Sequence, residues 1–246
     1  MVYLILSDIH GNWEALSAVV EAAKGRYAQV ICCGDVVGYG ADPNRVSEWV
    51  QAHTALTVRG NHDKFCSGIE PIHNLSPLAA AAAVWTLRNL SPQNKVWLQQ
   101  LPKGPVDFDE MRILHGSVRD EDEYIFDVED ARQVADQLSA NVLFFGHTHR
   151  QGIFYCHRNG IRQGGGPPEK QTELQFEVDD TASWLINAGS VGQPRDGDPR
   201  AAYALFDTVS RNLTLCRVAY NVALAQAKIR AAGLPAKLAD RLKLGT

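Results

Sequence analysis

Five short segments of this chain place residues that bind metals or move protons directly after short apolar runs. Apolar runs of this length, rich in β-branched residues, are typical of buried β-strands. Residues that follow parallel strands gather at one edge of a sheet, where open α/β folds hold their sites. Five of the eight histidines fall in these segments, a concentration that packing alone does not explain. The segments are DIH at residues 8–10, GDVVG at 34–38, GNHD at 60–63, LHG at 114–116 and GHTH at 146–149, and the apolar runs are residues 2–6, 30–33, 56–58, 111–114 and 142–145.

Helical patterns alternate with these strands through the first 150 residues, which favours a largely parallel sheet covered by helices. The first four expected helices follow a polar N-cap residue, and three of them begin with proline. The N-cap residues are Asn12, Asp42, Ser76 and Ser91, and the expected helices cover residues 13–24, 43–52, 77–90, 92–101 and 128–138.

After residue 150 the pattern changes to short strands and turns. Arg158-Asn159-Gly160 is a hairpin signal, and the Gly/Pro-rich residues 164–168 are expected to form a mobile loop. Strands are expected at residues 153–156, 174–178, 184–187, 202–206 and 213–218. Consecutive strands with short turns predict a second, largely antiparallel sheet packed on the first. Asn221 is expected to cap a helix over residues 222–232, and another helix is expected at 237–242.

The length of 246 residues suits one sizeable core, and we predict a single domain over residues 1–246. Its expected parts are a motif-bearing α/β part (1–150), second-sheet strands (about 151–218) and C-terminal helices (about 221–244). A net charge of −4 gives no basic footprint for nucleic acid or anionic lipid, and no stretch is long enough to span a membrane. The five cysteines show no CxxC pairing and nothing resembles a signal peptide, so we expect a cytoplasmic protein.

The motifs supply seven candidate metal ligands with nitrogen or oxygen donors and no thiolate. Such a donor set is typical of sites for Mn²⁺, Fe, Zn²⁺, Co²⁺ or Ni²⁺, and differs from that of a cysteine-rich structural zinc site. Seven side chains are too many for one ion with an open position, and they suit two ions that share a bridging carboxylate. The seven candidates are Asp8, His10, Asp35, Asn61, His115, His147 and His149.

The motif order DxH, GDxxG, GNHD, HG, GHTH resembles the calcineurin-like metallophosphoesterase superfamily, in particular its small bacterial phosphodiesterase-type members. The resemblance extends to residues 186–195, INAGSVGQPR, which are similar to an INPGSxxxPR segment of those members, with Ala188 in place of proline. It implies a four-layer α/β/β/α sandwich of two packed mixed sheets. It also implies a phosphoesterase acting on phosphodiesters or phosphomonoesters through a hydroxide activated by two divalent ions, with manganese as the first expectation.

The same resemblance implies a role for each matching residue. Asp8, His10 and His149 would hold one ion. Asn61, His115 and His147 would hold the other, with Asp35 between them. His62 would protonate the leaving oxygen with Asp63 orienting its ring, and capping of a helix or turn is the alternative role for Asp63. Arg195 would bind a phosphate oxygen, with a solvated loop salt bridge as the alternative. Structural roles are expected instead for Arg59, Arg200, Tyr39 and Asn12, and the charged residues 119–123 are expected to form a solvated loop with the pocket rim as the alternative.

Two other functions are compatible with these motifs. One is a protein serine/threonine phosphatase or a dinucleoside-polyphosphate hydrolase, although the chain lacks long insertions that would build a protein-docking groove. The other is a non-catalytic interaction scaffold on the same fold, but such scaffolds tend to lose ligands that this chain retains. We therefore expect a phosphoester substrate, of small-molecule size, no membrane or nucleic-acid partner, and leave a homo-oligomer open.

Overall fold

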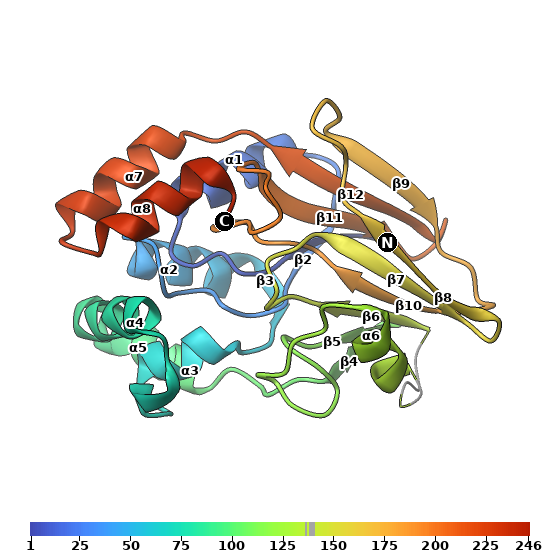
Figure 1. The fold of residues 1–246 in the computed structure, drawn as a ribbon, viewed down its shortest axis with the longest axis horizontal. Helices are drawn as coiled ribbons and strands as arrows, with labels where there is room; N and C mark the ends of the chain where they lie inside the picture. The colour runs from blue at the N-terminus through green and yellow to red at the C-terminus, as the bar shows by residue number, and fades with distance from the viewer. Residues whose placement is uncertain (136, 138–140) are drawn as a thin grey trace.

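The strands of the described residues form two six-stranded sheets that pack face to face (Figure 1). The computed structural model describes residues 1–135, 137 and 141–246. From one edge of the first sheet to the other, the strands are β3 (Thr54–Thr57), β2 (Gln29–Cys32), β1 (Val2–Leu6), β11 (Ala201–Asp207), β12 (Asn212–Val218) and β9 (Glu173–Glu177). Across the second they are β4 (Val106–Phe108), β5 (Met111–Ile113), β6 (Val142–Phe145), β10 (Ser183–Asn187), β7 (Gly152–His157) and β8 (Gly160–Gly165).

Both sheets combine a parallel core with antiparallel additions. In the first sheet β1, β2 and β3 run parallel, while β11, β12 and β9 add antiparallel. In the second, β5, β6 and β10 run parallel, and β4, β7 and β8 add antiparallel. The parallel strands of each sheet therefore end on one edge, which is the edge that carries the motifs.

Helices cover the outer faces of this sandwich and complete four layers. Helices α1 (Trp13–Ala22) and α2 (Pro43–His53) lie on the first sheet, and α6 (Val128–Ala135) lies on the second (Figure 1). The remaining helices are α3 (Asn61–Ser67), the 3₁₀ turn η1 (Ile72–Asn74), α4 (Pro77–Asn89), α5 (Pro92–Gln99), α7 (Val222–Ala231) and α8 (Ala236–Leu244). This is the predicted α/β/β/α sandwich of two mixed sheets. Within the described residues, none of the helices is both long and apolar enough to cross a bilayer.

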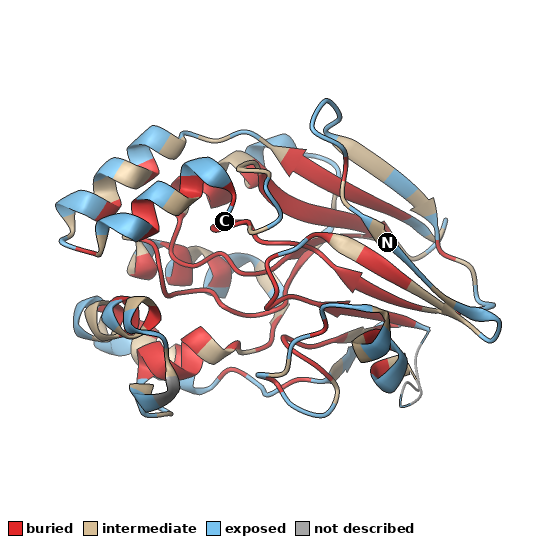
Figure 2. Ribbon diagram, in the orientation of Figure 1, coloured by how far each residue is buried: buried red, intermediate tan, exposed pale blue. Residues whose placement is uncertain are grey.

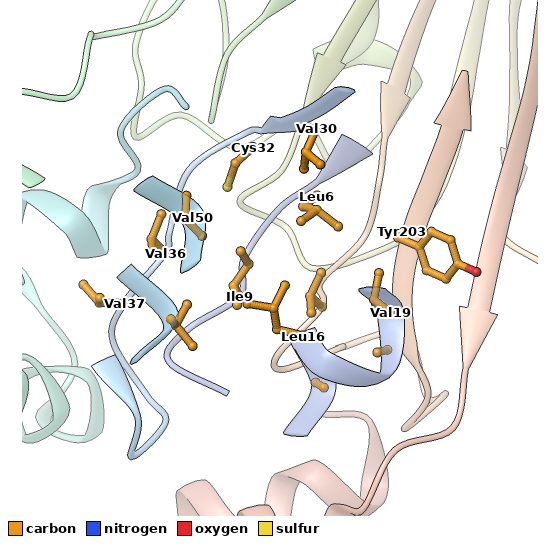
Figure 3. Packing of buried hydrophobic residues seen from close by; sticks show 14 of the residues in the cluster. Leu6, Ile9, Leu16, Val19, Val30, Cys32, Val36, Val37, Val50 and Tyr203 are labelled. Atoms are coloured by element: carbon orange, nitrogen blue, oxygen red, sulfur yellow. The ribbon is translucent and has the colours of Figure 1, made fainter. Parts of the chain in front are cut away.

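The period-2 alternation of strand side chains explains how the layers share the apolar residues. Leu4 and Leu6 of β1 face α1 and α2, whereas Tyr3 and Ile5 face the second sheet. Figure 3 shows Leu6 among Ile9, Leu16, Val19 and Val30 in the outer layer. The central strands of both sheets and the motif segments are buried, the edge strands β4, β8 and β9 are partly exposed, and the helices expose one face (Figure 2).

Cys32 and Cys33 divide between the same two layers, as the alternation predicts, with Cys32 in the outer cluster and Cys33 between the sheets. Both are fully buried. No disulfide joins the five cysteines, all of which lie in the described part of the chain.

The predicted division of strands between the sheets is wrong. Strands β9, β11 and β12 join the first sheet beside β1, while β5 and β6 belong to the second. Strand β11 is buried on both faces, which suits a central position next to β1 better than a separate sheet. The sheet to which a strand belongs depends on its pairing with distant segments, and the local sequence pattern of the strand does not specify those partners.

The predicted mobile loop at residues 164–168 is also wrong in part. Gly164 and Gly165 belong to β8, paired with β7, and Gly166 donates its N–H to the Gln151 carbonyl at 3.1 Å. Pro167 is buried. A Cβ on Gly152 would lie 2.5 Å from the Gly164 carbonyl, so the absence of a side chain at Gly152 lets the two strands lie close together.

Most predicted helix starts are confirmed, because Asn12, Ser76, Ser91 and Asn221 each accept a capping N–H bond. The predicted helix start at Pro43 is confirmed as well, but the Asp42 carboxylate makes no cap bond and instead accepts from Lys228 Nζ at 2.8 Å. The predicted helix over residues 128–138 ends as α6 at Ala135, and part of its last turn lies outside the described residues. Three elements, α3, η1 and β4, were not predicted.

Candidate metal centre

The predicted ligands lie beyond the carboxyl ends of parallel strands from both sheets. Asp8 and His10 follow β1, Asp35 follows β2, and Asn61 begins α3 after β3. His115 follows β5, and both His147 and His149 follow β6. Both sheets thus bring their motif edges together at one end of the sandwich.

One group of donors combines Asp8, His10, Asp35 and His149, all of them buried. The Nε2 atoms of His10 and His149 are 3.0 Å apart. Asp8 Oδ1 is 3.2 Å from His149 Nε2 and 3.8 Å from His10 Nε2. These distances give four donor atoms around one small space.

A second group combines Asp35, His115 and His147. His115 Nε2 lies 3.1 Å from His147 Nδ1 and 3.3 Å from the Asn61 amide oxygen Oδ1. The structure therefore brings all seven predicted ligands together, divided as the resemblance implied.

Asp35 belongs to both groups. Its Oδ2 atom lies 3.6 Å from His10 Nε2 and 3.4 Å from His115 Nε2. Its other oxygen, Oδ1, accepts the backbone N–H of His62 at 2.8 Å. Oδ2 is buried with no hydrogen-bond partner among the described residues, and buried polar atoms are rarely left so. This atom stands where a bridging ligand would stand.

Each of the four histidines in the two donor groups uses its other ring nitrogen to donate a hydrogen bond to a backbone carbonyl oxygen. Such a bond fixes the tautomer and turns the lone pair of the other nitrogen toward the cluster, as is usual for metal-binding histidines. The four bonds join His10 Nδ1 to Val37 O (3.1 Å), His115 Nδ1 to Cys33 O (2.8 Å), His149 Nδ1 to Gln193 O (2.6 Å) and His147 Nε2 to Asp122 O (2.9 Å).

The backbone at the cluster is strained in a way that structures keep mainly at functional sites. Seven non-glycine residues of the described chain have positive φ, and five of them are predicted ligands. These five are Asp8, His10, Asp35, His147 and His149, with φ between 51° and 66°. Gly38, at φ 138°, makes room for the rings, because a Cβ there would lie 2.8 Å from both His10 Nδ1 and His62 Nδ1.

Burial and mutual charge set the protonation of the ligands. Burial acts to lower the pKa of His115, but the Asp35 carboxylate outweighs it and raises that pKa to about 10. Burial acts to raise the pKa of Asp35, and His115 outweighs it in turn and holds that pKa well below its usual range. Burial also lowers the pKa of His10 and His149 well below the usual range. Without metal, His115 is therefore protonated and Asp35 ionised at neutral pH, while His10 and His149 are neutral.

These observations test whether metal ions fit the residues present. The neutral rings of His10 and His149 direct their Nε2 lone pairs at each other across 3.0 Å, beside an Asp35 oxygen that has no partner in the described part of the chain. This arrangement is unfavourable unless a cation lies between these atoms. Nitrogen and oxygen donors of this kind suit the first-row divalent metals. The residues fit two divalent ions.

His62 borders the cluster without belonging to either donor group. It is buried, its ring lies 4.9 Å from that of His10 and 4.4 Å from that of Tyr39, and its Nδ1 has no partner among the described residues. Burial lowers the pKa of His62 to about 4, against the opposing charge of Asp35. The imidazole is neutral at pH 7 in the free protein, and a proton donated from it would have to be acquired with substrate.

Of the two roles expected for Asp63, the structure shows the capping role. Its carboxylate makes no hydrogen bond to His62 in the described structure. It instead accepts four backbone N–H groups, from Gly60 and Asp35 on Oδ2 and from Val36 and Val37 on Oδ1. Asp63 caps α3 and ties the GNHD segment to the GDVVG loop, so it fixes the backbone that carries Asn61 and Asp35. The sequence signal was an acidic residue three positions after a helix start.

Arg195 lies beside the cluster, and its backbone N–H donates to the His149 carbonyl at 3.1 Å. Its guanidinium donates from Nε and an NH group to Gln193 Oε1 at 3.3 and 2.8 Å and lies 5.4 Å from the centre of the Tyr39 ring. Burial lowers the pKa of His149, and the charge of Arg195 lowers it further. A cation this close to the ligands is placed to meet an anionic group. Gln193, which also holds His149, was not predicted.

In the charged segment 119–123, Arg119, Asp120 and Asp122 are exposed, as expected of a solvated loop, but Glu121 is buried, so the expectation is wrong for that residue. Glu121 is buried and pairs with Arg59 at 2.9 Å and Lys64 at 3.3 Å. The Asp122 carbonyl holds His147, and the next residue, Tyr124, stacks on the His147 ring at 3.8 Å. A run of alternating charges usually indicates an exposed segment. The local sequence does not show that Glu121 has partners far along the chain that bury it.

The other near-motif candidates have the structural contacts expected of them. Arg59 pairs with Glu121 and Arg200 with Asp198. Asn12 caps α1 and donates to the Gly192 carbonyl.

A family model described as the calcineurin-like phosphoesterase superfamily domain matches residues 1–211. The chain belongs to this superfamily. Members of this family typically bind divalent metals, and the buried donor groups described above are suited to them.

Similar proteins cover nearly the whole chain. An uncharacterized protein of Methanocaldococcus jannaschii is 34% identical over 98% of this chain and 97% of its own length. A metallophosphoesterase from Sphaerobacter thermophilus has a sequence 35% identical to this chain. Its crystal structure matches with a TM-score of 0.88 over 100% of this chain and 99% of that one. A hypothetical protein from Pyrococcus horikoshii OT3, 18% identical with a TM-score of 0.79 over 100% of this chain and 98% of that one, shares the fold. This calcineurin-like phosphoesterase therefore has relatives along its full described length.

Proposed function

We propose that this calcineurin-like phosphoesterase hydrolyses phosphomonoesters or phosphodiesters of small molecules with two divalent metal ions, manganese first among them. The observation that carries the proposal is the unpartnered Asp35 Oδ2, which lies between His10 on one side and His115 on the other. Two donor groups that share one carboxylate are the arrangement of two-metal hydrolases.

When bound, the ions would polarise the phosphoryl group and make water a nucleophile at neutral pH. The chain's own residues supply the rest. Arg195, already oriented by Gln193, binds a phosphoryl oxygen as a charged donor. His62 faces the cluster with an unpartnered Nδ1, takes up a proton with the anionic substrate and donates it to the leaving oxygen.

Retention of all seven ligand positions favours this proposal over a non-catalytic scaffold. We also propose that the protein acts in the cytoplasm, a location consistent with five cysteines that form no disulfide. Homo-oligomer formation remains compatible with the structure.

Metal dependence tests the proposal directly. Protein stripped by exhaustive chelation, with removal verified by elemental analysis, is assayed on a panel of phosphomonoesters and phosphodiesters before and after addition of Mn²⁺, Fe²⁺, Zn²⁺, Co²⁺ or Ni²⁺. We expect no turnover in the stripped protein and recovery with Mn²⁺. Asp35→Asn is the matched variant, since it should fail to recover with any of these metals. Undiminished turnover in the verified metal-free protein would overturn the proposal.

A further inference from the structure

A buried lysine outside the donor groups is linked to the metal ligand His147 through two successive contacts. Lys64 lies on α3, three residues after Asn61, and is 1% exposed, which makes it the largest fully buried side chain of the described residues. Its Nζ is 2.7 Å from Asp122 Oδ2, and the backbone carbonyl of the same Asp122 accepts from His147 Nε2 at 2.9 Å. The two contacts connect α3 to the ligand segment after β6.

Lys64 belongs to a network of several ion pairs rather than to a single salt bridge. Lys64 contacts Glu70 at 3.2 Å and Glu121 at 3.3 Å in addition to Asp122. Arg59 binds the Glu121 carboxylate through two bonds, at 2.9 and 3.0 Å. Burial acts to lower the pKa of Lys64, but the bond to Asp122 and the neighbouring carboxylates outweigh it and raise that pKa. The ammonium is charged at neutral pH. Removing it leaves the partly exposed carboxylates of Glu70 and Asp122 without this counter-charge, and leaves the buried Glu121 with Arg59 alone.

The segment that this network holds fits closely against its surroundings. A Cβ on Gly116 would lie 2.5 Å from the Glu121 carbonyl and 2.7 Å from the Glu123 carbonyl, so the loop folds tightly back on the His115 strand. Tyr124 covers the His147 ring from the same loop, at 3.8 Å and 12° between planes. The loop thus fixes both the tautomer and the orientation of one ring.

The other donor group does not use this loop. His10 is held by the Val37 carbonyl and His149 by the Gln193 carbonyl. A displacement of residues 121–124 therefore changes the orientation of His147 while leaving the partners of His10 and His149 in place.

We propose that Lys64 is a positioning residue that, through Glu121 and Asp122, holds His147 in ligand geometry and so sets the affinity of the Asn61/His115/His147 site selectively. The inference rests on the proposed two-metal function. Loss of such outer partners typically weakens metal binding by about 10–100-fold. The expected effect is a loss of this size at one site of two.

Mn²⁺ binding to the metal-free full-length chain tests the inference without reference to turnover. Binding is followed by calorimetry and equilibrium dialysis, and the magnetic coupling between two bound ions by electron paramagnetic resonance. We expect wild type to bind two ions with a spin-coupled signal. Lys64→Met should bind the first ion as wild type does, bind the second roughly 10–100-fold more weakly, and show an uncoupled signal at one equivalent.

Three further variants separate positioning from general destabilisation. Lys64→Arg keeps the charge and should recover most of the second affinity. Asp122→Asn removes one carboxylate whose side chain is 40% exposed, so it should fold even where Lys64→Met does not, and it should weaken the same site. Lys228→Met is the matched control, because Lys228 also joins two carboxylates, Glu14 at 2.6 Å and Asp42 at 2.8 Å, but contacts neither residues 119–124 nor His147.

The outcomes distinguish this inference from the proposed function. A wild-type chain that binds fewer than two ions overturns the two-metal function and this inference with it. A wild-type chain with two ions, combined with equal weakening of both sites in Lys64→Met or unchanged binding in Asp122→Asn, overturns the inference alone. Weakening of the second site by Lys228→Met to the same extent would also overturn it.

Discussion

Replacement of His62 by alanine separates proton donation from metal binding at this site. His62 is buried against His10 and Tyr39 but belongs to neither donor group, so His62→Ala should keep both ions. General acid catalysis is typically worth about 10²–10⁴-fold. We expect kcat/KM to fall by that factor on alkyl phosphoesters, whose leaving oxygen needs a proton. The fall should be much smaller on p-nitrophenyl esters, whose leaving group departs without one.

The lowered pKa adds a pH signature to this prediction. With a pKa of about 4, only about one molecule in 10³ of the free protein carries a protonated His62 at pH 7. This fraction falls further as pH rises. The ratio of alkyl to aryl turnover, in which effects of pH on metal and nucleophile cancel, should therefore decrease from pH 6 to pH 8 in wild type. In His62→Ala the ratio should be low and flat.

The assay compares both esters across this pH range with metal content measured in each sample. His53→Ala is the control, since His53 is exposed and stacks on Trp49 away from the cluster, and its ratio should match wild type. Equal losses on alkyl and aryl esters would show that His62 positions substrate without donating a proton. Loss of an ion from His62→Ala would make it a ligand and refute the assignment.

Two further predictions follow from the protonation and hydrogen bonding of the cluster. Asp63→Asn should leave two of the four backbone N–H groups at this carboxylate unsatisfied, which costs roughly 1–3 kcal/mol each. Denaturant unfolding of the metal-free protein should show this loss, and an unchanged midpoint would contradict the capping role. With its pKa raised to about 10, His115 is protonated at pH 8 in the metal-free protein, so metal loading should release about one proton and weaken as pH falls. Calorimetry in buffers of different ionisation enthalpy measures the release, and His115→Ala should abolish it while lowering metal occupancy; a release unchanged by that variant would contradict the account.

The site was largely predictable from sequence because its residues are local to strand ends. An apolar run followed by Asp8, Asp35 or His115 defines both the strand and the edge at which its ligand lies. The parallel strands of each sheet end on one side, so five separate motifs point to one centre.

The contacts that support the ligands were not predictable, because they join segments far apart in the chain. Nothing near Glu121 in sequence indicates that it meets Lys64, and nothing near Asp63 indicates that its acceptors are filled by the loop at Asp35. For the same reason the sheet to which β11 belongs could not be read from its own residues. Local sequence patterns therefore predict the secondary-structure elements and the metal ligands. Strand pairing and the contacts that support the ligands depend on the assembled fold.

A crystal structure of the manganese-loaded protein, with anomalous scattering to locate each ion, tests the central claim most directly. The account predicts two anomalous peaks roughly 3.5–4 Å apart. One should be bound by Asp8, His10 and His149 and the other by Asn61, His115 and His147, with Asp35 contacting both. A single peak in a metal-replete crystal, or an Asp35 carboxylate turned away from one of the two ions, would contradict it.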